Sequence, residues 1–249
     1  MPDQEELVLI YGTRAVIEAI RSGSAFERVY LQQGLVNPLM RELRQELHSA
    51  NIHYQMVPQE KLNRMIRGNH QGVVAYQSPL EYASVSECVS NAFQSGKVPL
   101  FLILDRITDT RNLGAIARTA ECAGVDALIL PSRGSALING DAIKTSAGAL
   151  NHLPVCREDN LKDTIDFLKE SGIRVVACSE KGRSVSRAVD FSMPLAIIMG
   201  SEENGVSSEY MKRCDEAIKL PMAGNVSSYN VSVATGMVLY EVMCQRKSS

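Results

Sequence analysis

Apolar and polar positions alternate along the first third of the chain in short strand-like and helix-like runs. Short apolar runs predict four strands, at residues 7–10, 28–31, 53–57 and 73–76. Apolar residues at helical spacing between them predict three helices, at residues 14–21, 38–50 and 58–66. Alternating strands and helices of these lengths are typical of a small α/β domain.

The predicted strands become more apolar in the remainder of the chain. Residues 100–104 (LFLIL) are apolar throughout, as expected of a strand that is buried on both faces. Further strands are predicted at residues 127–130, 174–178, 194–199 and 218–220, and helices at residues 112–122, 142–150, 160–171, 207–213 and from residue 231 onward. This order predicts a mostly parallel sheet with helices on both faces.

A polar, Ser-rich segment separates the two patterns. Residues 81–96 contain one short helical pattern, at residues 85–93, and we interpret the segment as a linker. The predicted organisation is therefore an N-terminal α/β domain at residues 1–80 and a larger α/β domain at residues 97–249.

Composition narrows the class of protein. The chain has 249 residues, of which 45% are apolar and 22% charged, and no apolar run approaches the ~20 residues of a membrane span. Residues 1–6 are acidic and lack the features of a signal peptide. The six cysteines and four histidines show no metal-ligand spacing. We therefore expect a cytoplasmic protein with reduced thiols, no metal and no membrane partner. A net charge of −2 neither favours nor excludes binding of nucleic acid.

The first candidate site segment is residues 218–241. A short strand is followed by a loop with Gly224, then by Ser228 and Asn230, which suit a helix start. The helix thus opens on a loop rich in backbone donors, which could hold a polar ligand. An ordinary capped strand–loop–helix connection is the alternative.

The second segment is residues 105–118. Asn112 can cap the predicted helix, and Gly114 would let another backbone pass close to its first turn. Three arginines, Arg106, Arg111 and Arg118, follow one strand end, and arginine recognises phosphate with two parallel hydrogen bonds. The segment is either a phosphate or ribose clamp, or a capped helix with solvated arginines.

The third segment is residues 199–205 (MGSEENG). Glu202 follows a buried strand, where its carboxylate could accept hydrogen bonds from a ligand or orient an arginine. A polar turn is the alternative. All three segments fall at the carboxyl ends of predicted parallel strands, where open α/β sheets bind ligands. No GxGxxG follows the first strand of either half and no GxxxxGK[ST] occurs, which argues against a nicotinamide dehydrogenase and a P-loop NTPase.

These segments also resemble a known family. NxGxxxRTA at residues 112–120, MGSExxG at residues 199–205 and LPMxGxxxSxNVSVAxGxxLYE at residues 220–241 resemble the TrmH (SpoU) family of RNA 2′-O-ribose methyltransferases in the SPOUT superfamily. Residues 11–16 (YGTRAV) and 69–75 (NHQGVVA) resemble the substrate-binding domain that precedes the catalytic domain. The layout is most similar to the bacterial branch that methylates a guanosine of large-subunit (23S) ribosomal RNA.

The resemblance implies a fold, a cofactor and partners. It implies a trefoil knot near the C-terminus, S-adenosylmethionine bound by the knotted loops, RNA as substrate, and a homodimer with the active site near the subunit interface. The implied catalytic residues are Asn112, Arg118, Glu202, Ser228 and Asn230. The implied cofactor-binding residues are Met199, Gly200, Glu202, Gly205, Leu220, Met222, Gly224, Ser228, Tyr229 and Val231. Tyr229 stands where the family usually has Leu.

RNA-binding candidates lie in both domains. They are Arg14, Arg64, Arg67 and His70 in the first domain and Arg106 and Arg111 in the second. We interpret Arg118 as a clamp that stabilises negative charge on the attacking 2′-oxygen, because arginine stays protonated in proteins, with Glu202 and Ser228 orienting it. The alternatives are a transfer-RNA ribose methyltransferase and a non-catalytic RNA-binding protein on the same scaffold.

Overall fold

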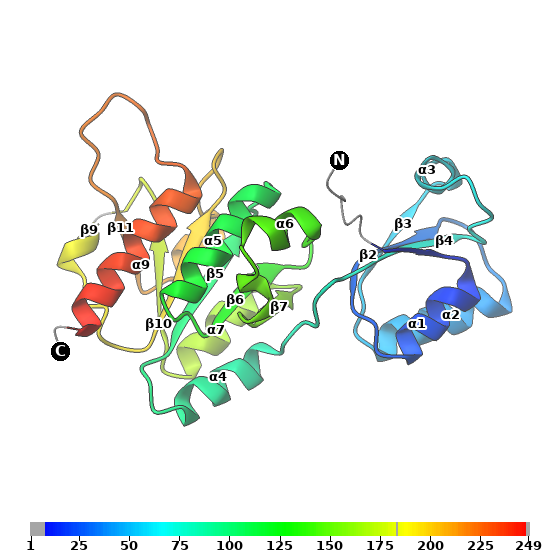
Figure 1. The fold of residues 1–249 in the computed structure, drawn as a ribbon, viewed down its shortest axis with the longest axis horizontal. Helices are drawn as coiled ribbons and strands as arrows, with labels where there is room; N and C mark the ends of the chain where they lie inside the picture. The colour runs from blue at the N-terminus through cyan, green and yellow to red at the C-terminus, as the bar shows by residue number, and fades with distance from the viewer. Residues whose placement is uncertain (1–7, 183, 248–249) are drawn as a thin grey trace. The chain divides into compact units, whose positions relative to one another are not determined.

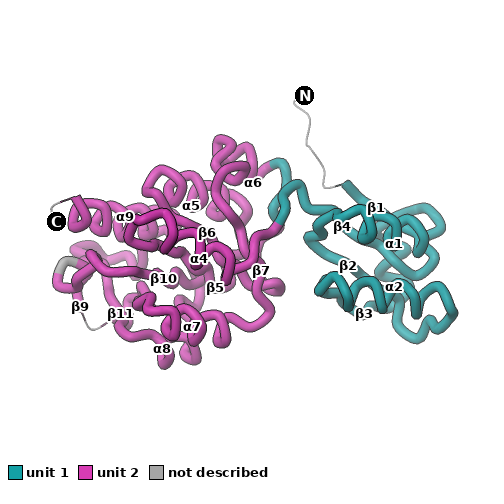
Figure 2. The backbone as a smooth tube through the Cα atoms, turned by 90° about the horizontal axis from the view of Figure 1, so that it is seen from below, with its two compact units in different colours: residues 1–81, 138–140 teal, residues 82–137, 141–249 magenta. Residues whose placement is uncertain are grey.

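The computed structural model describes residues 8–182 and 184–247, so residues 1–7, including the start of the first predicted strand, lie outside the described residues. The chain divides into two compact units (Figures 1 and 2). Unit 1 comprises residues 1–81 and 138–140, and unit 2 comprises residues 82–137 and 141–249.

Unit 1 is a small α/β unit built on a mixed sheet. Its strands lie in the order β1-β4-β2-β3, with β4 antiparallel to both its neighbours and β2 parallel to β3. The strands are β1 (Leu9–Tyr11), β2 (Phe26–Gln32), β3 (Tyr54–Val57) and β4 (Val73–Gln77), and the helices are α1 (Thr13–Arg21), α2 (Pro38–Ser49) and α3 (Gln59–Met65). The predicted elements of this unit are confirmed to within two residues at the described ends.

Both faces of this sheet are covered. Helices α1 and α2 bury Val16, Ile17 and Leu43 against one face, and Leu62 of α3 packs against Tyr30 and Val74 on the other. Figure 1 shows α3 across the sheet from α1 and α2.

Unit 2 is organised around a seven-stranded sheet in which every recorded pair is parallel. The strand order is β7-β6-β5-β10-β8-β11-β9. The strands are β5 (Leu100–Asp105), β6 (Ala127–Pro131), β7 (Val155–Glu158), β8 (Arg174–Cys178), β9 (Ser184–Val185), β10 (Leu195–Gly200) and β11 (Glu216–Lys219). All residues of β5 and β10 are buried, which explains their continuous apolar sequences.

Helices cover both faces of this sheet, as predicted. They are α4 (Val85–Gln94), α5 (Thr110–Cys122), α6 (Gly140–Thr145), α7 (Leu161–Glu170), α8 (Ser208–Arg213) and α9 (Val231–Lys247), with short 3₁₀ turns at Ala149–Asn151 and Ser186–Ala188. Helices α4, α7 and α8 share one core with alternate residues of β5, β6, β8 and β10. Helices α5 and α9 pack against each other (Figure 1).

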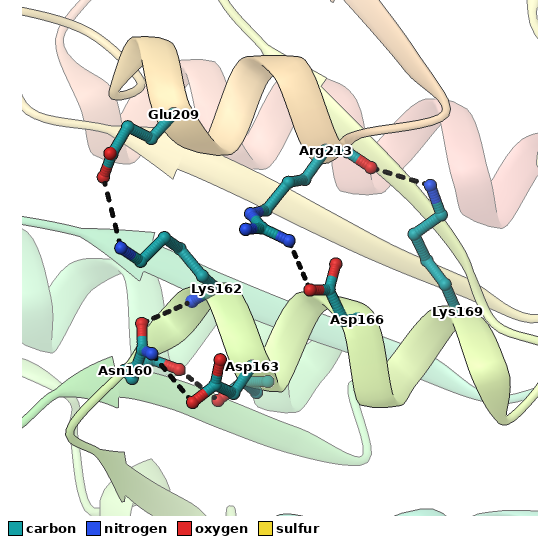
Figure 3. A network of polar contacts seen from close by, with 8 residues as sticks. Asn160, Lys162, Asp163, Asp166, Lys169, Glu209 and Arg213 are labelled. Atoms are coloured by element: carbon teal, nitrogen blue, oxygen red, sulfur yellow. Dashed lines mark hydrogen bonds and ion pairs between the residues drawn. The ribbon is translucent and has the colours of Figure 1, made fainter.

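Charged side chains join α7 to α8 at the surface of this core (Figure 3). Lys162 pairs with Glu209, and Arg213 pairs with Asp166. Lys169 also donates to the carbonyl oxygen of Arg213 at 2.7 Å, which caps the end of α8.

The predicted linker requires a correction. Residues 81–96 contain α4, whose Val85, Cys88, Val89 and Ala92 are all less than 10% exposed and belong to the core of unit 2. The polar composition reflects only the outer face of this helix. We therefore place the start of unit 2 before α4.

One other prediction was wrong, and two strands were not predicted. The helix predicted at residues 142–150 ends at Thr145, because Ala147 and Gly148 both have positive φ and start a separate 3₁₀ turn. Strand β7 was not predicted, because only its first two residues, Val155 and Cys156, are apolar and buried, and strand β9 was not predicted, because it has only two residues. Within the described residues, no helix is long and apolar enough to span a bilayer.

Candidate active site

Two central strands of unit 2 end side by side and carry two of the candidate segments. Strands β5 and β10 are parallel neighbours in register, with Gly200 opposite Asp105 at their carboxyl ends. The chain runs outward from β5 to β6 and β7 on one side, while β8 and β11 lie on the other side of β10. This edge is therefore the switch point of the sheet, where open α/β folds bind ligands.

A buried carboxylate joins the loops that leave these two strands. Asp105 is 1% exposed and accepts hydrogen bonds from the Ser207 backbone N–H at 2.7 Å and from Arg106 Nε at 2.8 Å. Arg106 also donates to the Gly205 carbonyl oxygen at 3.2 Å. The hydrogen bond to Asp105 raises the pKa of Arg106, so the guanidinium stays charged. Arg106 was predicted to bind RNA, which stays a prediction; in the structure its guanidinium holds the loop at residues 201–205.

The N-terminus of α5 differs from the prediction. Asp109, not Asn112, caps the helix, because its carboxylate accepts from the backbone N–H groups of Arg111 and Asn112. Asn112 lies one turn further on. Its side-chain amide is consequently available for contacts outside the helix.

Three predicted catalytic residues from distant parts of the chain meet at this edge. Asn112 Nδ2 donates to Glu202 Oε1 at 2.6 Å. Asn230 Nδ2 donates to Asn112 Oδ1 at 3.1 Å and to Glu202 Oε1 at 3.3 Å. The Glu202 carboxylate is therefore held by two amides, one from α5 and one from the start of α9.

Backbone donors fix the orientation of these amides. Asn230 Oδ1 accepts from the backbone N–H of Ser232 at 2.9 Å, which caps α9 as the sequence predicted. Because a backbone N–H can only donate, the amide oxygen of Asn230 must face the helix and its NH₂ group must face Glu202. Asn112 then presents its oxygen to Asn230 and its NH₂ group to Glu202.

A polar hollow of about 210 Å³ opens beside this cluster. Its lining residues come from the loops after β5 and β10 and from the first turns of α5 and α9. They are Arg106, Ile107, Thr108, Asp109, Asn112, Ser201, Glu202, Glu203, Asn204 and Val231. Glu202 was predicted to orient an arginine, but Asn112 and Asn230 are its partners instead.

Glycines allow the backbone to pack closely around the hollow. A Cβ on Gly200 would lie 2.0 Å from the Gly205 carbonyl carbon, and Gly205 itself has a φ of +62°. A Cβ on Gly114 would lie 2.8 Å from the Ala142 carbonyl oxygen, which confirms the predicted close approach to the first turn of α5.

The first candidate segment, residues 218–241, contains an exposed loop between β11 and α9. Within the described residues, no backbone or side-chain group of residues 222–228 makes a hydrogen bond to the protein. The Tyr229 hydroxyl donates to the Pro221 carbonyl oxygen at 2.9 Å and so joins the two ends of the loop. Met222, Gly224 and Ser228 lie in this loop and Leu220 precedes it, whereas the Met199 side chain is buried in β10.

Each of the two units matches a known protein family model. Residues 99–240 match the model of the SpoU rRNA Methylase family, and residues 9–83 match the model described as RNA 2′-O ribose methyltransferase substrate binding. The first match alone covers more than half of the chain. The chain belongs to the SpoU rRNA methylase family. As a member of this family it is an RNA 2′-O-ribose methyltransferase.

Relatives of this SpoU-family chain match it along its length. A Bacillus subtilis (strain 168) protein, provisionally named TrmH family tRNA/rRNA methyltransferase YacO, is 38% identical over 99% of this chain and 98% of its own. The solved AdoMet-bound rRNA methyltransferase from Sinorhizobium meliloti is 25% identical, with a TM-score of 0.60 over 94% of this chain and 85% of its own. The A. aeolicus TrmH/SpoU tRNA modifying enzyme is 30% identical, with a TM-score of 0.56 over 66% of this chain and 84% of its own.

Other predicted residues of the SpoU domain are not brought to the hollow. Arg118 is exposed on α5, and within residues 8–182 and 184–247 it makes no hydrogen bond or ion pair. Arg111 is likewise exposed and does not line the hollow, so of the three predicted arginines only Arg106 belongs to the lining. Ser228 also lies outside the lining and contacts neither Arg118 nor Glu202 through a hydrogen bond.

The substrate-binding unit contains a second hollow, of about 580 Å³. Of the four residues predicted to bind RNA in this unit, Arg14 and His70 line it, whereas Arg64 and Arg67 do not. His70 is 6% exposed and both of its ring nitrogens are hydrogen-bonded within the unit, so it orients neighbouring groups.

Sequence reasoning missed Asp105 and Asp109. Asp105 directly follows five apolar residues of β5. A carboxylate at the end of such a buried strand could have been predicted to be buried and hydrogen-bonded. Asp109 directly precedes the first helical residue, Thr110, and therefore occupies the N-cap position. Asn112 lies inside the first turn and cannot be the cap.

Proposed function

We propose that this SpoU-family enzyme transfers a methyl group from S-adenosylmethionine to the 2′-hydroxyl of a guanosine in large-subunit ribosomal RNA. The observation that carries the proposal is the joined Asn112, Glu202 and Asn230 cluster at the switch point of the parallel sheet. The cluster lines a hollow at this position, where open α/β sheets bind ligands.

The residues of this chain fit S-adenosylmethionine. The cofactor carries a carboxylate, an ammonium, ribose hydroxyls and an adenine, all of which need hydrogen-bonding partners. The loop at residues 222–228 has unpaired backbone donors and acceptors, and it lies between the candidate residues Leu220 and Asn230. Arg106 holds the Gly205 carbonyl oxygen and Asp105 holds the Ser207 N–H just beyond residues 199–205, while the Tyr229–Pro221 hydrogen bond joins the ends of the other loop.

Each group of the site then has a role in the proposed reaction. When bound, S-adenosylmethionine would supply an electrophilic methyl carbon: the bond from the 2′-oxygen to this carbon would form as the carbon–sulfur bond breaks, S-adenosylhomocysteine would be the leaving group, and the hydroxyl proton would pass to solvent. Glu202, held by two amides, accepts hydrogen bonds from ribose or cofactor groups. Asn112 and Asn230 fix its direction, which favours transfer by positioning the 2′-oxygen.

We further propose that the active form is a homodimer with a trefoil knot in each subunit. Helix α9 exposes three apolar side chains at helical spacing, Val233 (54%), Met237 (37%) and Tyr240 (68%). Such a stripe is suited to pack against a second copy. Arg118 lies on the neighbouring helix α5 and stays outside its own hollow, so it clamps phosphate or the 2′-oxygen from across the interface.

Ribosomal RNA is favoured over transfer RNA by the presence of unit 1. The rRNA methyltransferase from Sinorhizobium meliloti matches 94% of this chain, whereas the A. aeolicus tRNA modifying enzyme matches 66% of it. An additional substrate-binding unit is therefore in keeping with a large structured RNA. A transfer-RNA ribose methyltransferase is the second candidate, because the name of the Bacillus subtilis relative includes both tRNA and rRNA as substrates.

Methyl transfer from tritiated S-adenosylmethionine to separated ribosomal and transfer RNA tests this proposal. We expect label in large-subunit RNA, released on digestion as 2′-O-methylguanosine. Label in transfer RNA alone would move the enzyme to the second candidate. Cofactor binding without transfer to free RNA or to ribosomal particles would contradict the catalytic proposal and favour an RNA-binding protein.

A further inference from the structure

The hollow in unit 1 is lined mainly by side-chain amides. Its lining contains six Asn or Gln residues, one arginine, one buried histidine and two leucines, and no carboxylate. The amides are Gln32, Asn37, Gln59, Asn63, Asn69 and Gln71. A volume of about 580 Å³ is in the range of small-molecule sites in proteins. The family model assigns this region to substrate binding without naming a residue or a ligand group.

Backbone N–H groups fix the orientation of three of these side-chain amides in the same way. Asn37 Oδ1 accepts from Met40 N at 2.7 Å, and Asn69 Oδ1 accepts from Gln71 N at 3.2 Å. Gln71 Oε1 accepts from Thr13 N at 3.2 Å. Because a backbone N–H can only donate, each of these side chains must turn its oxygen toward the protein, and its NH₂ group is left pointing away from that contact.

His70 fixes the orientation of a fourth side-chain amide in the same way. The Gly72 backbone N–H donates to His70 Nδ1 at 2.9 Å, so Nδ1 carries no hydrogen. The hydrogen of the neutral ring therefore lies on Nε2, which is 2.9 Å from Asn63 Oδ1 and donates to it. Asn63 must present its oxygen to the ring and keep its NH₂ group free.

The hollow is consequently rich in donors. In the part of the chain that the structure describes, none of the NH₂ groups of Asn37, Asn63, Asn69 and Gln71 has a protein partner. Arg14 adds a cation to the same lining, and Leu35 and Leu39 add apolar surface. A ligand that fits must offer several acceptor atoms, a flat or apolar face and a negative charge.

We propose that this hollow binds one unpaired nucleotide of the RNA substrate and prefers a base that carries carbonyl oxygens, uracil or guanine, over adenine. Carbonyl oxygens and ring nitrogens would accept from the free NH₂ groups, the base would cover the leucines, and Arg14 would contact its phosphate. Adenine has no carbonyl oxygen and presents an amino donor to a donor-rich wall. Single-stranded, unstacked bases are the usual targets of sequence-specific RNA recognition.

This inference rests on the proposed function for its ligand, RNA, but it is tested on its own site. Fluorescence anisotropy of the full-length chain with labelled oligouridylate and oligoadenylate would measure the preference. We expect oligouridylate to bind about tenfold more tightly than oligoadenylate. Equal binding of the two, or tighter binding of oligoadenylate, would overturn the proposal.

Isosteric acid variants test the residues. Asn63→Asp and Gln71→Glu keep the oxygen that accepts from His70 or Thr13 but replace the free NH₂ donor by a second, charged oxygen. We expect each to weaken oligouridylate binding about tenfold. Gln55→Glu is the matched control, because it adds the same charge on an exposed residue of unit 1 outside the hollow, and it should change affinity less than about twofold.

The outcomes separate this proposal from the proposed function. If the acid variants bind oligouridylate and methylate RNA as well as the parent does, the hollow is not the nucleotide site, although the enzyme is an RNA methyltransferase. If the parent binds no RNA and transfers no methyl group, the proposed function itself fails. Circular dichroism melting of each variant ensures that a loss of binding is not a loss of fold.

Discussion

At the residue scale, the site depends on amides whose direction is set by groups outside the site. Asn230 caps α9 with its oxygen and reaches Glu202 with its NH₂ group, so one side chain serves both the helix and the cluster. Asn112 reaches the cluster only because Asp109 has taken over the capping of α5. The two asparagines therefore link the geometry of the candidate site to the helix ends.

Replacing Asn230 by Asp separates these two roles. Asn230→Asp keeps an oxygen for the Ser232 N–H but places a carboxylate beside Glu202, and like charges repel at this distance. We expect the rate of methyl transfer to fall at least about tenfold, with the melting temperature near that of the parent. A rate equal to that of the parent would show that the Asn230–Glu202 contact is not part of catalysis.

Arg118→Lys tests the clamp. Lysine keeps the charge but loses the planar fork that binds phosphate or an oxyanion with two hydrogen bonds. We expect the turnover number to fall by about a hundredfold, while Arg41→Lys, a conservative change at an exposed arginine of unit 1, leaves it unchanged. Near-normal turnover of Arg118→Lys would remove the clamp from the mechanism.

At the element scale, close backbone contacts position the loops. Asp105 at the end of β5 holds Ser207, which follows the loop after β10, and this loop packs Gly200 onto Gly205. Because that contact is between backbone atoms, no rotamer change can relieve an added methyl group.

Gly200→Ala should therefore destabilise the SpoU domain. The new Cβ would meet Gly205 and Val206 backbone atoms at about 2 Å, and we expect the free energy of unfolding to fall by about 1–3 kcal/mol, together with a loss of methyl transfer. Urea unfolding measures the change. Gly224→Ala is the control for stability, because nothing lies within 4 Å of its Cβ, and a similar loss there would refute the explanation by close contact.

The exposed stripe of α9 makes a second prediction at this scale. Introducing charge with Met237→Glu and Tyr240→Glu together should convert a dimer to a monomer and reduce methyl transfer, as analytical ultracentrifugation and activity would show. Phe93→Glu, at an exposed apolar residue of α4, should leave the dimer intact. A parent enzyme that is already monomeric when active would contradict the proposed dimer.

The sequence predicted most of these elements because their apolar periods are clear. Buried strands such as β5 and the amphipathic helices of unit 1 follow from local pattern alone. The pattern failed where tertiary contacts decide: Ala147 breaks a predicted helix by a positive φ, and α4 looked like a linker because its buried face is short. Likewise, Asn112, Glu202 and Asn230 could be named as candidates, but not their mutual hydrogen bonds, which depend on distant caps.

At the scale of the whole molecule, the chain combines a SpoU catalytic unit with a separate substrate-binding unit. The boundary between them matters for any attempt to separate them. Deletion of residues 1–96 would follow the predicted linker, but it would remove α4 and uncover the core face that Val85, Cys88 and Val89 fill.

Two truncations test this assignment. Residues 82–249 should fold, bind S-adenosylmethionine and lose most RNA affinity, whereas residues 97–249 should melt at a lower temperature because the apolar surface beneath α4 is exposed. Thermal melts and cofactor titration measure both. Equal melting temperatures would show that α4 adds nothing to unit 2, and unchanged RNA affinity would argue against a substrate-binding role for unit 1.

The central claim, that the methyl group goes to a ribose 2′-oxygen, can be tested on the labelled RNA product. Alkaline hydrolysis needs a free 2′-hydroxyl, so a 2′-O-methylated nucleotide keeps its 3′-linkage and label from S-adenosylmethionine should be recovered in dinucleotides. We predict this result for the parent enzyme, and at least about tenfold slower appearance of labelled dinucleotides for Asn230→Asp. Recovery of the label in mononucleotides would place the methyl group on a base and contradict the proposed reaction.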